Sequence, residues 1–187
     1  MKVSLLDITD DALYKIGFYS SVCYDSNVER EACIRRAKHV AQKGHLACLR
    51  FATATFKIED ISRVCSHQMV RSKHLDFLQR SQRYVEETDP KFVYPTSNTD
   101  SRVSTLYQAA YTLYKDLLKE GVKREDARFV LPNGGTTELV VTGNFQAWLD
   151  FIKLRADKYA QWEIRDVAKE INNILSGHAP GLFNWMP

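Results

Sequence analysis

Long apolar runs, paired cysteines and a strong net charge are all missing from this sequence of 187 residues. No apolar stretch reaches the roughly 20 residues that a membrane-spanning helix needs, and residues 1–4 do not have the layout of a signal peptide. We therefore expect a cytoplasmic protein without a membrane segment. The four cysteines include no Cys-x-x-Cys pair, which predicts reduced core thiols and no metal site.

The sequence also has little charge imbalance and no recognisable nucleophile motif. Lys and Arg total 26 against 23 for Asp and Glu, and the net charge of +3 argues against a protein that binds nucleic-acid polymers. There is no nucleophile elbow and no Ser-His-acid arrangement. No repeat or linker divides the chain, so residues 1–187 are interpreted as one domain, and a hydrophobic content of 44% is enough for a sizeable core.

The most unusual segment is residues 71–84, which is rich in Arg, Lys, Gln and Ser. Such side chains can donate forked or converging hydrogen bonds to phosphate or carboxylate oxygens. A solvated basic helix face is the commoner explanation for a charge run alone. Here, however, apolar residues at helical spacing from Ile61 to Met69 precede the segment, which suggests that packed structure holds it. We therefore interpret residues 71–84 as a binding loop for an anionic ligand.

Hydrophobic periodicity predicts helices around a few strands that do not alternate regularly with them, and hence an α+β fold. Strands are predicted at residues 3–8, 49–58 and 137–142, and a short extended piece at residues 91–95. A first helix is predicted from Asp11 onward and a second at residues 27–43, where Gly44 ends it. Further helices are predicted at about residues 61–71, 102–120, 124–130, 145–154 and 160–175.

Several separated segments of the sequence form an ordered set. The first is Phe56-Lys57-Ile58-Glu59-Asp60-Ile61-Ser62-Arg63-Val64-Cys65-Ser66-His67-Gln68-Met69-Val70-Arg71, continued by Gln79-Arg80-Ser81-Gln82-Arg83-Tyr84-Val85. The later ones are Glu125-Asp126-Ala127-Arg128-Phe129-Val130-Leu131-Pro132-Asn133, Val140-Val141-Thr142-Gly143-Asn144, Leu154-Arg155 and Ala160-Gln161-Trp162-Glu163-Ile164-Arg165. They resemble the motifs of the flavin-dependent thymidylate synthases in the family's order, and that family's R-H-R-x-x-S-x-N/S-E/Q-x-S-x-R-Y signature corresponds to residues 71–84. Motifs in a fixed order are more specific than any one of them. The resemblance covers roughly residues 40 to 180 and implies a central, mainly antiparallel sheet wrapped by helices.

The resemblance implies reductive methylation of dUMP at C5, with the one-carbon unit from methylenetetrahydrofolate and the hydride from NADPH through FAD. It implies a homotetramer with active sites between subunits, and no nucleophilic side chain, because the flavin carries the electrons. By the same resemblance, Arg155 would lie at the pyrimidine carbonyls as the catalytic residue. The remaining nucleotide-binding residues would be Gln68, Gln79, Ser81, Arg83 and Arg128, and the residues that bind FAD would be Arg71, Lys73, Asn144 and Asp150.

The differences from the family pattern lie on the flavin side. Arg-His-Arg is replaced by Arg71-Ser72-Lys73, Asp76 stands in place of a serine, and Arg50 in place of a glutamate. A lysine does not reproduce the forked hydrogen bonds of an arginine. Three alternatives therefore stay open: a related pyrimidine deoxynucleotide methylase or hydroxymethylase acting on dUMP or dCMP, a non-catalytic nucleotide-binding subunit, and a basic RNA- or DNA-binding module.

Overall fold

A four-stranded antiparallel sheet forms the centre of the protein. The computed structural model describes residues 1–23, 25–97 and 100–183. The strands are β1 (Lys2–Ile8), β2 (Thr53–Ser62), β3 (Leu75–Gln79) and β4 (Thr136–Asn144), in the spatial order β1-β2-β4-β3. The two central strands thus come from distant parts of the chain, and Phe56 pairs with Val141 in their register.

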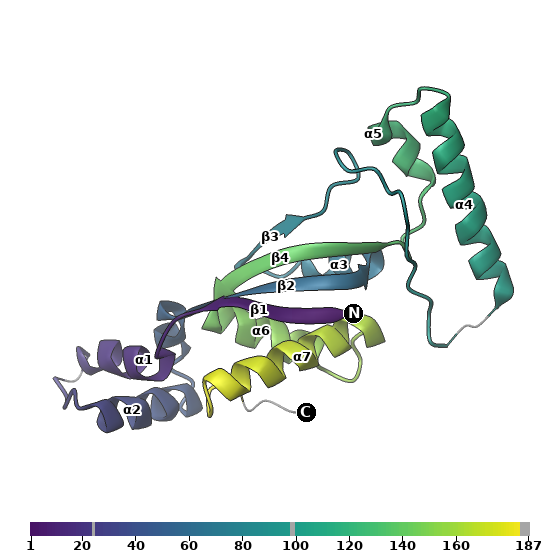
Figure 1. The fold of residues 1–187 in the computed structure, drawn as a ribbon. Coiled ribbons are helices and arrows are strands. Elements are labelled where there is room, and N and C mark those ends of the chain that lie inside the picture. Colours follow the sequence, from purple (N-terminus) through teal and green to yellow (C-terminus); the bar gives the residue numbers. More distant parts are fainter. Residues whose placement is uncertain (24, 98–99, 184–187) are drawn as a thin grey trace.

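Helices cover one face of this sheet and extend from both of its ends (Figure 1). Those that pack on the sheet are α3 (Arg63–Met69), α6 (Phe145–Arg155) and α7 (Trp162–His178). At one end lie α1 (Ala12–Ser21), α2 (Arg30–Gln42) and the 3-10 helix η1 (Leu46–Phe51). At the other end α4 (Ser101–Lys119), α5 (Arg124–Ala127) and the 3-10 helix η2 (Arg128–Val130) form a projecting arm. The observed class is α+β, as predicted.

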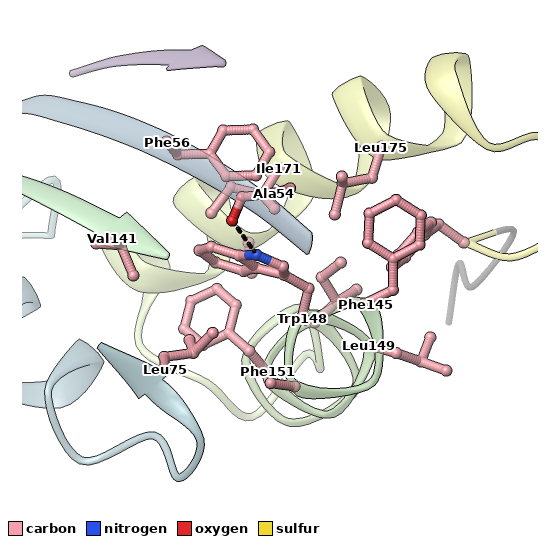
Figure 2. Close-up of a cluster of buried hydrophobic side chains, with 14 of the residues drawn as sticks. Ala54, Phe56, Leu75, Val141, Phe145, Trp148, Leu149, Phe151, Ile171 and Leu175 are labelled. Atoms are coloured by element: carbon pink, nitrogen blue, oxygen red, sulfur yellow. Dashed lines mark hydrogen bonds between the residues drawn. The ribbon is translucent and has the colours of Figure 1, made fainter. Parts of the chain in front are cut away.

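The main core lies between the sheet and helices α6 and α7, and Trp148 is at its centre (Figure 2). The indole is fully buried, and its N–H donates to the carbonyl of Ala54 at 3.0 Å. Phe56 and Phe151 meet the ring edge-on, with centroid distances of 5.0 Å and 5.9 Å. Because a buried indole N–H needs an acceptor, this bond fixes the position of α6 against β2 as well as filling space.

The alternation of buried and exposed residues along β2 and β4 shows that only one face of the sheet is apolar. On the opposite face Lys57 pairs with Glu59 at 2.8 Å and with Glu138 at 3.0 Å. This second face therefore carries charge and faces away from the core.

Three predicted boundaries were wrong. The predicted binding loop contains an edge strand, Leu75–Gln79, because Leu75 and Phe77 pack inward while Asp76 and Leu78 point out along β4. The strand predicted at residues 49–58 lies instead at Thr53–Ser62, since η1 occupies the preceding residues. The next helix consequently begins at Arg63 rather than at Ile61.

The prediction for the cysteines was only partly right. All four thiols are free, but only Cys33 and Cys65 are buried, whereas Cys48 is half-buried and Cys23 is exposed. A separate observation concerns membranes: within the described ranges, no helix combines the length and the apolar character required to cross a bilayer.

Candidate functional site

The short helix α3 organises the candidate site because side chains of α6, α7 and β3 form hydrogen bonds with it or with its N-cap residue. Its N-cap is Ser62, whose hydroxyl oxygen accepts from the Cys65 N–H at 3.0 Å. The carboxylate of Glu163, at the start of α7, accepts from the Ser62 N–H at 2.7 Å and from the Ser62 hydroxyl at 2.5 Å. Both residues are buried, so α3 begins on a fixed polar contact with α7.

At the C-terminal end of α3, Arg155 of α6 reaches the main chain of Gln68. Its Nη2 donates to the Gln68 carbonyl at 3.1 Å, while its Nε is buried and has no hydrogen-bond partner among the described residues. The positive charge also acts on Cys65: burial and then Glu163 raise the pKa of this thiol, and Arg155 opposes them. The structure therefore places Gln68 and Arg155, two of the predicted nucleotide-binding residues, next to each other.

At the N-terminal end of α3, Arg63 lies beside two further arginines. Burial lowers the pKa of the Arg63 guanidinium, and the positive charges of Arg128 and Arg80 lower it further, whereas Glu87 acts in the opposite direction. An α3 of seven residues is only about 10 Å long. Arg63 thus lies at one end of this helix, and the contact between Arg155 and Gln68 lies near the other.

Ser81, Arg83 and Arg128 form a second connected group. The Ser81 hydroxyl accepts from the Arg83 N–H at 3.2 Å. Arg83 Nε lies 2.7 Å from the Glu125 carboxylate, and Arg128 Nε donates to the Glu125 carbonyl at 3.1 Å. Arg83 also lines an open pocket of about 430 Å³ between the loop after β3 and the α4–α5 connection. Glu125 holds both guanidinium groups, and sequence reasoning did not single it out.

Gln79 points into the protein. Its side-chain nitrogen donates to Ser66 of α3 at 3.1 Å and to Thr137 of β4 at 3.2 Å. These bonds tie the end of β3 to α3, so the side-chain oxygen is the part of Gln79 that remains for a ligand.

Two of the four predicted flavin-binding residues share a pocket of about 250 Å³ at the other end of β4. It is lined by Arg50, His74, Asn144, Gln146, Ala147 and Asp150. The Asn144 side-chain oxygen caps α6 by accepting from the Ala147 N–H at 2.9 Å, which leaves its NH2 group to donate. Arg50 Nε donates to the Gln146 oxygen at 2.7 Å.

The other two, Arg71 and Lys73, lie in the turn between α3 and β3. Both are exposed, and neither has a hydrogen bond or ion pair with another residue in the described ranges. His74 of the same turn reaches the 250 Å³ pocket and has a left-handed backbone with φ of 64°. Since this conformation is uncommon outside glycine, the turn adopts a specific shape rather than that of a regular helix end.

Sequence reasoning assigned no role to Arg63 or Glu163, although both lie in segments that resemble the family's motifs. That position was the only signal for either residue, and no other local pattern distinguished Arg63 from a surface arginine. Only the three-dimensional structure shows that its side chain turns inward.

Comparison with known proteins identifies the family of this chain. The family model described as "Thymidylate synthase complementing protein" matches residues 4–181. The chain belongs to this family. The match begins well before residue 40, where the recognisable motifs begin, and so includes β1 and helices α1 and α2.

Relatives within the thymidylate synthase complementing protein family are similar over nearly the whole chain. A protein from Geobacter sulfurreducens named "Flavin-dependent thymidylate synthase" is 36% identical over 198 aligned residues, covering 98% of this chain and 85% of its own length. Proteins of the same name from Mycobacterium tuberculosis and Mycobacterium avium are each 33% identical, covering 90% of this chain and 77% of their own lengths.

Proposed function

We propose that this chain is a flavin-dependent thymidylate synthase and that residues 1–187 act as one catalytic domain. The reaction is the reductive methylation of dUMP, with methylenetetrahydrofolate as the one-carbon donor and NADPH as the reductant. The observation that carries this proposal is the convergence on α3, where Arg155 meets Gln68 at one end and Arg128 lies near Arg63 at the other. Family membership and the names of the relatives support the same reaction.

The phosphate and sugar of dUMP would be bound by Ser81, Arg83 and Arg128. Arg83 is mostly solvent-exposed, with 55% of its side chain accessible, so it can turn from Glu125 toward a phosphate without a large desolvation cost. Hydrogen bonds from guanidinium groups to a phosphate are charge-assisted and often bidentate. Together with the Ser81 hydroxyl, they would fix the orientation of the nucleotide.

Arg155 would act on the pyrimidine ring. Negative charge develops on the ring carbonyls when a hydride adds to the conjugated pyrimidine system, because the displaced electron pair is delocalised onto the carbonyl oxygens, and a fixed guanidinium would stabilise that charge. The bond to the Gln68 carbonyl orients this guanidinium before substrate binds. Preorganisation of this kind avoids reorienting the side chain during the reaction.

The residues around the 250 Å³ pocket fit a flavin. The Asn144 NH2 group and the Arg50 guanidinium can donate to the ring carbonyls or to ribityl oxygens, and Asp150 can accept. Arg71 and Lys73 would bind the anionic part of FAD. When bound, FAD supplies the hydride that it has received from NADPH.

We propose in addition that the active enzyme is a homotetramer with its sites between subunits. The projecting arm supports this because it leaves large apolar side chains exposed, including Leu106 and Leu113 on α4 and Phe129 after α5. Phe129 follows Arg128 directly and has 83% of its surface accessible. Contact of a second copy with this surface would bury it next to the proposed phosphate site.

The test measures flavin binding and product formation with the same purified protein. Wild-type protein with FAD should give a visible absorption spectrum that changes when dUMP is added. With methylenetetrahydrofolate and NADPH also present, mass analysis should identify dTMP as the product, and Arg155→Ala should abolish its formation with an unchanged circular dichroism spectrum.

The possible failures of this test separate the alternatives. A hydroxymethylated product, or turnover of dCMP in place of dUMP, would replace the proposed reaction. Binding of dUMP without any binding of flavin would refute catalysis and leave a nucleotide-binding subunit. Full turnover by Arg155→Ala would refute the role of Arg155.

A further inference from the structure

Arg63 connects the start of α3 to the loop that carries the proposed phosphate-binding residues. Its backbone N–H donates to the carbonyl of Gly135 at 3.1 Å, and its side-chain Nη2 donates to the carbonyl of Arg80 at 3.3 Å. Arg80 is the residue directly before Ser81. The side chain of Arg63 therefore acts on the main chain at the point where β3 ends and the loop begins.

The Arg80 peptide is held from both sides. Its N–H donates to the Glu138 carbonyl on β4 at 3.0 Å, while its carbonyl accepts from Arg63. The loop then turns back on itself, since the Val85 N–H donates to the Ser81 carbonyl at 2.9 Å and the Arg83 N–H donates to the Ser81 hydroxyl. The orientation of Ser81 and Arg83 thus depends on the Arg80 peptide, and through it on Arg63.

The charge around Arg63 is incompletely neutralised. Within the described ranges no carboxylate lies at ion-pair distance from its guanidinium, and its Nε is buried without a hydrogen-bond partner. The negative charge of Glu87 acts on the Arg63 guanidinium, but Glu87 lies 3.9 Å from Arg80 and has one buried oxygen without a hydrogen-bond partner. Burying an arginine among other arginines costs free energy that a bound anion would offset.

We propose that Arg63 is a positioning residue for the 5′-phosphate of the nucleotide: it holds the Arg80–Ser81 peptide in the binding conformation and adds a positive charge behind the loop. This inference rests on the proposed function, because it takes the phosphate site to be at Ser81, Arg83 and Arg128. It assigns to Arg63 a part of the discrimination between a nucleotide and its nucleoside. A purely structural role would weaken binding of both ligands alike.

The test compares the affinity for dUMP with that for deoxyuridine, which lacks the phosphate. Calorimetric titrations use the full chain with the same excess of FAD in every sample. Arg63→Lys retains the charge but not the planar fork, and Arg63→Met removes both. The matched control is Arg35→Met, because Arg35 is an exposed arginine on α2 whose one ion pair among the described residues is with Glu31, one turn earlier.

We expect Arg63→Met to reduce the preference for dUMP over deoxyuridine by at least about tenfold, which corresponds to about 1.4 kcal/mol. Arg63→Lys should give a smaller loss in the same direction, and Arg35→Met none. If the wild-type protein prefers dUMP and the folded Arg63 variants keep the same preference, the role of Arg63 is refuted while the proposed phosphate site stands. Failure of both variants to fold would also overturn it, in favour of a structural role. A wild-type protein with no preference for dUMP would refute the proposed phosphate site itself.

Discussion

Replacing Ser62 by alanine tests whether the contact between α7 and α3 stabilises the protein as strongly as its geometry indicates. The Ser62 hydroxyl makes two hydrogen bonds, accepting from the Cys65 N–H and donating to the Glu163 carboxylate at 2.5 Å. Ser62 is 2% exposed and Glu163 is 4% exposed, so water does not replace either bond in the variant without rearrangement. The substitution therefore removes a helix cap and leaves a buried carboxylate oxygen without its donor.

The two losses have different sizes. Loss of a serine N-cap costs about 1 kcal/mol. Loss of a hydrogen bond to a buried charged group costs about 1.5–3 kcal/mol. We therefore expect Ser62→Ala to lower the free energy of unfolding by about 2.5–4 kcal/mol. The Glu163 carboxylate still accepts from the Ser62 N–H, which is why the variant should remain folded.

Urea unfolding, followed by circular dichroism, measures this loss, and Asn144→Ala provides a matched control. Asn144 caps α6 through the same kind of bond, to the Ala147 N–H, but no hydrogen bond joins it to a buried carboxylate in the described part of the chain. Asn144→Ala should lower the free energy of unfolding by about 1 kcal/mol, because only the helix cap is lost. If Ser62→Ala costs no more than Asn144→Ala, at an unchanged urea dependence, the reasoning about Glu163 is refuted.

Three further predictions follow from other sites. Arg155→Lys should retain dUMP binding but lose most of its turnover rate, because lysine keeps the charge and loses the fork; a turnover rate equal to that of wild type would contradict this. Burial raises the pKa of the Cys65 thiol in the folded protein, so as pH rises this thiol loses its proton first in the unfolded chain. Above about pH 8.5 the free energy of unfolding of the wild type should therefore fall more steeply with pH than that of Cys65→Ala. Equal pH dependence of the two proteins would contradict this prediction. Lys57→Met should leave the free energy of unfolding little changed, since the ion pairs of Lys57 with Glu59 and Glu138 are partly solvated. A large loss of stability in urea titration would show that this network is structural.

The local patterns that predicted most helices and strands did so because one face of each element is buried. The apolar spacing along residues 160–175 and the alternation along residues 137–142 are examples, and they correspond to α7 and β4. The same reasoning failed at Leu75–Gln79. This strand is short, lies at the edge of the sheet and has charged residues around it, so its pairing with β4 left no clear signal in five residues.

The sequence by itself determined the family resemblance and the types of residue available for binding an anionic nucleotide. Their positions along the chain also placed Arg155 at the end of a helix and Ser81 and Arg83 in a loop, and the structure has both arrangements. These features are local, because helix and strand periodicity and motif order are properties of neighbouring residues.

Only the tertiary structure decided which side chains meet at α3. Glu163 is 101 positions from Ser62, and Arg155 is 87 positions from Gln68. Contacts at such separations form because burial of the whole core fixes α6 and α7 against the sheet, and no segment of the sequence encodes them alone. The inward turn of Arg63 is of the same kind: its neighbours along the chain do not distinguish it, whereas its contact with the Arg80 carbonyl does.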